Sequence, residues 1–97
     1  MITLFISSLC PDCPPALEAF ENSSLDYKII DITESMANLK AFLKYRDKDS
    51  FFNSIKANCQ VGVPSIMVGD GEKFYSFSSE LDLKIYNFNE KEITTTL

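Results

Sequence analysis

The sequence predicts an α/β protein in which one small mixed sheet carries helices on both faces. An apolar run at the N-terminus, Met1–Ser7, has the length of a single buried strand and is followed directly by a helix-forming stretch. Further along, segments with strand alternation are separated by segments with helical spacing. The chain has 97 residues, of which 45% are apolar, so we expect one core and one domain spanning residues 1–97.

The first third of the chain predicts a β-α-β unit. Met1–Ser7 is rich in Ile, Leu and Phe and ends at paired serines. A helix is predicted over about Pro14–Asn22, with Leu17 and Phe20 on its buried face. Leu25–Ile32 alternates apolar and polar residues for most of its length and predicts a second strand. Because strands joined through a helix cross over with a right hand, these two strands should be parallel.

Two helices are predicted in the middle of the chain. Apolar residues recur at helical spacing over Met36–Arg46, and Thr33 or Ser35 is expected to cap this helix. A short extra helix is predicted at about residues 50–58, where Phe51, Phe52 and Ile55 share one face. This spacing favours a role in filling the core, although the segment also lies where it could shape access to a site.

A hairpin is predicted after these helices. Pro64–Val68 and Lys73–Phe77 flank the turn signal Gly69–Glu72, so the two strands should be antiparallel. The tail is ambiguous, because residues 80–88 fit either a helix or a strand. Ser78 or Ser79 as N-cap favours a helix to about Asn87, and the tail after residue 88 is left unassigned. The predicted order is β-α-β-α-β-β-α with a four-stranded mixed sheet.

Composition narrows the classes of function. Nine basic and fourteen acidic residues give a net charge of −5, which disfavours nucleic acid and anionic membranes as partners, although solubility alone explains it equally well. The absence of His excludes Cys/His and Ser/His/Asp catalytic sets and His-based zinc sites. No segment has the pattern of a signal peptide or of a membrane span. The odd number of cysteines, three, argues against a secreted scaffold held together by disulfides. We therefore expect a cytoplasmic monomer.

The most informative motif is Cys10-Pro11-Asp12-Cys13, between the first strand and the first helix. Two cysteines at this spacing can close a small disulfide ring. Unpaired N–H groups and the helix dipole favour a thiolate at Cys10, the expected nucleophile, and Cys13, one turn further in, is the expected resolving cysteine. Pro11 suits the first helical position, whereas the Asp12 carboxylate opposes the thiolate.

Other interpretations of the cysteines remain open. Two cysteines at this spacing could be half of a zinc site, but the chain supplies only Cys59 as a further thiol and no His, so no metal site is expected within one chain. The pair could also be inert packing residues. Cys59 itself is expected to be a buried hydrophobe. Val63-Pro64 opens an apolar run and fits an ordinary turn into an edge strand.

Taken together, these features resemble the glutaredoxin branch of the thioredoxin superfamily over roughly residues 1–81. The resemblance implies a thioredoxin-like, glutaredoxin-type fold. It also implies a cis bond between Val63 and Pro64, with Pro64 beside the cysteines and the Val63 backbone offered to an extended substrate. Ser79 aligns with the family's carboxylate-binding stretch. Pro11, Asp12, Val63, Pro64 and Ser79 are accordingly the expected substrate-binding residues.

The resemblance implies a dithiol oxidoreductase that reduces protein or low-molecular-weight disulfides, with no tightly bound cofactor. Glutathione or a thioredoxin-reductase-like flavoprotein would restore the dithiol. The family's usual glutathione contacts are poorly matched, because Ser7, Gly62 and Phe77 stand at their positions. The alternative is a non-catalytic thioredoxin-like module that binds a partner or carries a metal.

Overall fold

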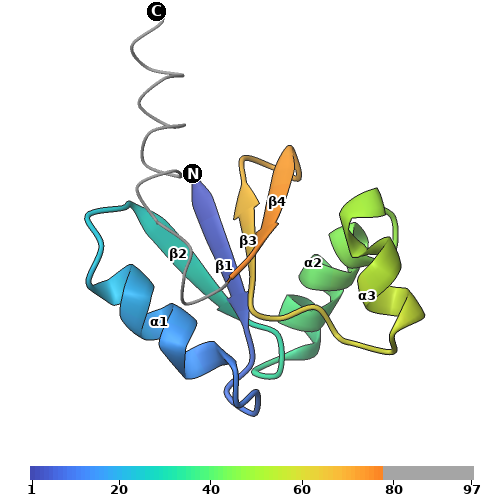
Figure 1. The fold of residues 1–97 in the computed structure, drawn as a ribbon, viewed down its shortest axis with the longest axis horizontal. Helices are drawn as coiled ribbons and strands as arrows, with labels where there is room; N and C mark the ends of the chain where they lie inside the picture. The colour runs from blue at the N-terminus through green and yellow to red at the C-terminus, as the bar shows by residue number, and fades with distance from the viewer. Residues whose placement is uncertain (78–97) are drawn as a thin grey trace, which may run out of the picture.

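A four-stranded mixed sheet with the strand order β2-β1-β3-β4 forms the centre of the computed structural model, which describes residues 1–77 (Figure 1). Its central strand, β1, pairs in parallel with β2, and β3 is antiparallel to both β1 and β4. The predicted mixed α/β sheet is confirmed. The strands are β1 (Ile2–Ile6), β2 (Tyr27–Asp31), β3 (Ser65–Val68) and β4 (Lys73–Ser76).

Helices cover both faces of this sheet, as the sequence predicts (Figure 1). The described helices are α1 (Cys13–Glu21), α2 (Met36–Arg46), the 3₁₀ turn η1 (Ser50–Phe52) and α3 (Asn53–Ala57). Of the two predicted caps for α2, Ser35 is the one used, since its hydroxyl accepts the backbone N–H of Asn38 at 3.1 Å. No helix within residues 1–77 has the length and apolar character needed to cross a membrane.

Alternation along β1 divides the core into two layers. Ile2, Leu4 and Ile6 point to one face, where they pack with Ala16 and Phe20 of α1. Phe5 points to the other face and joins an aromatic layer under α2 and η1. All five β1 residues are buried because the strand is central and covered on both sides.

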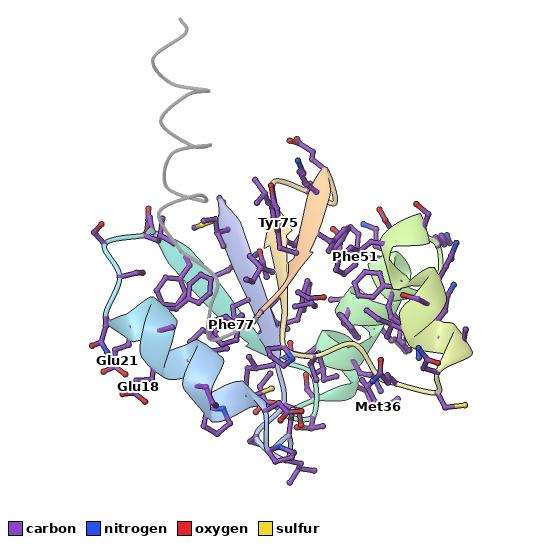
Figure 2. The ribbon with its side chains drawn as sticks, in the orientation of Figure 1. Glu18, Glu21, Met36, Phe51, Tyr75 and Phe77 are labelled. Atoms are coloured by element: carbon purple, nitrogen blue, oxygen red, sulfur yellow. The ribbon has the colours of Figure 1, made fainter. Side chains whose placement is uncertain are left out.

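The aromatic layer on the second face of the sheet is filled in part by η1, the segment that follows α2. Phe52 is fully buried, and its ring lies edge-on to Phe42, Phe51 and Phe74, at centroid distances of 5.8, 4.9 and 5.1 Å. Figure 2 shows Phe51 on the side of the sheet that α2 and α3 cover. The segment thus fills the core, as its Phe spacing favours, and it also leads the chain towards Pro64.

One sequence prediction differs from the structure. Pro11 is not the first helical residue, because α1 begins at Cys13 and Asp12 is its N-cap. The reason is that residues 10–13 form a separate turn, closed by the Cys13 N–H on the Cys10 carbonyl at 3.3 Å. The predicted final helix, and Ser79 with it, lies outside the described residues.

The role of Phe52 in the core can be measured. Replacing Phe52 with Ala removes a fully buried ring that three other rings contact, so we expect the free energy of unfolding to fall by about 3–5 kcal/mol. Met36→Ala is the matched control, since that side chain is 67% exposed, and it should change stability by less than about 0.5 kcal/mol. Urea titrations give both values. Equal losses in the two variants would contradict the assignment of this segment to the core.

Candidate active site

The loop between β1 and α1 carries Cys10 and Asp12. The Cys10 N–H donates to the Ser7 carbonyl at 3.1 Å, and the Cys10 carbonyl accepts the Cys13 N–H. Two consecutive turns therefore fold the loop back over the end of β1. Cys10 is left half-buried, whereas Cys13, the first residue of α1, has no exposed surface. The two thiols lie close enough to form a side-chain hydrogen bond.

Burial controls the state of Cys13. Loss of hydration is the main cause that raises the pKa of its thiol to about 12; the neighbouring Cys10 and Asp12 add to this rise, and the hydrogen bond from the Ser7 amide opposes it. That amide donates to Cys13 Sγ at 3.4 Å. Cys13 is therefore a protonated thiol at neutral pH, held beneath Cys10.

Two prolines follow Cys13 in the first turn of α1. Pro14 and Pro15 are the second and third helical residues, positions whose N–H groups have no partner inside a helix, so their missing N–H groups cost no hydrogen bond. They also leave two fewer donors at this helix end, which reduces the stabilisation it can give to an anion. The Asp12 side chain makes no capping hydrogen bond, so its carboxylate is not tied to the helix.

The segment before β3 faces the cysteine loop. The Val63–Pro64 peptide bond is cis, and Cys10 Sγ donates to the Val63 carbonyl at 3.9 Å. Gly62 has a φ of +110°, a conformation that favours glycine, and an added Cβ there would lie 3.3 Å from the Phe52 ring. Arg46 fixes the start of this segment: its Nη2 donates to the Gln60 carbonyl at 2.7 Å and its Nε to the Val61 carbonyl at 3.1 Å.

A groove of about 760 Å³ runs between the cysteine loop and this segment. Among the predicted site residues, Cys10, Asp12, Val63 and Pro64 line the groove together. Pro11 does not line it.

A cluster of hydrogen-bonded polar side chains, which the sequence analysis did not predict, forms the wall of the groove at Ser7 and Thr33. Asp31 Oδ1 accepts the N–H and the hydroxyl of Thr33 at 2.9 and 2.8 Å, and the N–H of Ser8 at 3.4 Å. The bonds from Thr33 lower the pKa of the Asp31 carboxyl, so it is ionised at neutral pH. Ser7 Oγ lies 2.9 Å from Thr33 Oγ1. The predicted topology could have indicated this cluster. The carboxyl ends of the parallel strands β1 and β2 meet at one edge of the sheet, and Ser7, Asp31 and Thr33 lie at those ends.

Cys59 is exposed, so the prediction that it is a buried hydrophobe is wrong. It ends the turn after α3 with a φ of +59°, and it is not part of the aromatic layer that Phe52 and Ile55 enter. Within residues 1–77, no group of three or more His, Cys, Asp or Glu side chains could hold a metal ion.

The fold and the groove define a thioredoxin-like α/β protein with a cysteine pair beside a cis-proline. The chain matches the Glutaredoxin family over residues 2–73 and belongs to that family. It is also 33% identical over 69 residues to a Haemophilus influenzae protein described as uncharacterized, a match that covers 71% of this chain and 80% of that protein. No solved structure gives a significant match. Family membership supports a redox role in general terms.

The burial of Cys13 can be tested by alkylation. With a pKa of about 12, roughly one Cys13 thiol in 10⁴ is ionised at pH 8, and the side chain has no exposed surface. Iodoacetamide at pH 8 should therefore label Cys59 and leave Cys13 almost unmodified, as read by peptide mass spectrometry. In urea all cysteines should react alike. Equal labelling of Cys13 and Cys59 in the folded protein would contradict the structure.

Proposed function

We propose that this protein is a dithiol thiol–disulfide oxidoreductase that reduces protein or low-molecular-weight disulfides. One observation carries the proposal: Cys10 lines an open groove beside the Val63 carbonyl, and Cys13 lies fully buried directly behind it. A partly exposed thiol backed by a shielded one is the arrangement that two-step disulfide exchange requires.

In the first step, the Cys10 thiolate attacks one sulfur of the substrate disulfide. The substrate S–S bond breaks, a mixed disulfide with Cys10 forms, and the other substrate sulfur leaves as a thiolate that takes a proton from water. The Val63 backbone would bind the substrate chain next to its disulfide, as an added strand does at a sheet edge. Pro11, Asp12, Pro64 and Ser79 complete the proposed substrate-binding set.

In the second step, Cys13 attacks Cys10 Sγ and releases the reduced substrate. The mixed disulfide carries no charge on Cys10 Sγ, which removes one of the causes that raise the pKa of Cys13. The Ser7 amide remains 3.4 Å from Cys13 Sγ and favours its thiolate. Burial still opposes ionisation, so this step depends on the local fall in pKa that accompanies formation of the mixed disulfide.

The Cys10–Cys13 disulfide formed in this way needs an external reductant. Members of the glutaredoxin family typically use glutathione, and we propose glutathione or a thioredoxin-reductase-like flavoprotein as the electron donor, with no tightly bound cofactor. We further propose that the redox domain comprises the whole chain, residues 1–97, and that it acts as a cytoplasmic monomer.

Insulin reduction tests this function. The assay is run with NADPH and either glutathione plus glutathione reductase or thioredoxin reductase, which also identifies the donor. Cys10→Ser should abolish activity because it removes the attacking sulfur. Cys13→Ser should stop at a mixed disulfide with the insulin chain, visible as an added mass that dithiothreitol removes.

Cys59→Ser is the matched control, since this cysteine does not line the groove, and it should keep wild-type activity. Full activity in Cys10→Ser would reject the proposed mechanism. Activity lost equally in Cys59→Ser would also reject it, because an exposed thiol outside the groove would then be needed.

A further inference from the structure

The groove is lined by negative charge without positive charge among the described residues. Among residues 1–77, Asp12 is the charged side chain that lines the groove, and no Lys or Arg lines it. Much of the remaining lining is apolar. Leu9 and Val61 are 81% and 54% exposed, and Phe77 follows the end of β4 (Figure 2). Leu9 on the cysteine loop and Val61 on the facing segment thus offer apolar surface that a substrate in the groove would cover.

A second carboxylate adds to this negative field. Asp31 is half-buried and does not itself line the groove, but it accepts both polar hydrogens of Thr33, a lining residue, at Oδ1. Those hydrogen bonds keep Asp31 ionised through neutral pH and fix its position at the wall. Asp12 and Asp31 therefore place negative charge on two elements around Cys10.

Arg46 is a cationic side chain that contacts the segment bordering the groove, and its donors are already used within the protein. Arg46 uses Nη2 and Nε on the carbonyl oxygens of Gln60 and Val61, and its Nη1 pairs with Asp47 at 3.4 Å. Its guanidinium therefore binds the backbone of the segment that borders the groove, and Arg46 does not line the groove itself. Among the described residues, an anionic group on a substrate would meet the Asp12 carboxylate in this groove and no lysine or arginine that lines it.

We propose that this groove selects peptide disulfides in which the cysteine is flanked by basic and apolar residues, and that it disfavours acidic disulfides. This inference rests on the proposed function, since Cys10 must attack the bound disulfide. A basic residue next to the substrate cysteine would lie near Asp12, and an apolar residue would cover Leu9 or Val61. The exchange step is unchanged: one substrate S–S bond breaks, one Cys10–substrate S–S bond forms, and one substrate thiol is released.

The test compares three symmetric disulfides of one short capped peptide, Ala-X-Cys-Leu-Ala, with X as Lys, Gln or Glu. Symmetric dimers make both sulfurs equivalent. The full-length chain carrying Cys13→Ser and Cys59→Ser stops at the mixed disulfide, whose formation is followed by mass spectrometry. Each rate is divided by the rate with dithiothreitol, because a basic residue accelerates attack by any thiolate.

The Lys peptide should react about tenfold faster than the Glu peptide after this division, with Gln between them, since each unit of charge at contact distance from a solvated carboxylate is worth about threefold. Asp12→Asn should bring the Lys/Glu ratio close to one, because it removes the carboxylate from which the tenfold ratio is calculated and leaves only the weaker effect of Asp31. This variant should fold normally because the Asp12 side chain makes no capping bond. The ratio should also fall towards one in about 1 M salt, where screening acts over about 3 Å.

Asp26→Asn is the matched control, because it removes the same charge from the opposite end of the sheet, where β2 begins beside Ile2. It should leave the ratio at its wild-type value. A wild-type ratio of one, with Cys10 still reacting, would overturn the proposed selectivity and leave the proposed function standing. A fall in the ratio as large in Asp26→Asn as in Asp12→Asn would also overturn it, by showing an effect of net charge. If no peptide forms a mixed disulfide at Cys10, both proposals fail.

Discussion

The geometry of the site depends on the hydrogen bonds of Ser7, the residue that follows β1. Its N–H donates to Cys13 Sγ, and its carbonyl accepts the N–H of Cys10. Its hydroxyl accepts the N–H of Leu9 and bonds to Thr33. One buried residue thus connects both cysteines to the wall formed after β2. Because β1 is buried along its length, this anchor is fixed by the core rather than by the loop.

The two cysteines differ because the fold surrounds them differently. Cys13 belongs to α1, whose inner face packs on Leu4 and Ile6, so its thiol is desolvated with the rest of that layer. Cys10 belongs to the preceding turn and faces the cis peptide bond before Pro64. The opposing segment is held independently, by Arg46 from α2 and by Phe52 beneath Gly62. The groove therefore has two walls supported by opposite faces of the sheet.

Local patterns predicted most of the fold and the centre of the site. Apolar periodicity is a property of neighbouring residues, so β1, α2 and the β3–β4 hairpin could be read directly, and Cys10 with Pro64 followed from motifs. The contacts of Ser8 with Asp31, of Ser7 with Thr33 and of Arg46 with Gln60 could not be predicted, because each joins residues 14 or more positions apart. Cys59 is exposed in a turn where its φ is positive, a conformation that no apolar pattern marks.

The central claim is that Cys10 and Cys13 form one redox couple from which Cys59 is excluded. Peptide mapping of the dilute protein after mild oxidation with diamide, under non-reducing conditions, tests it most directly. The expected result is a disulfide joining Cys10 to Cys13, with Cys59 recovered as a free thiol. Recovery of Cys13 as a free thiol, or a link between Cys10 and Cys59, would contradict the account.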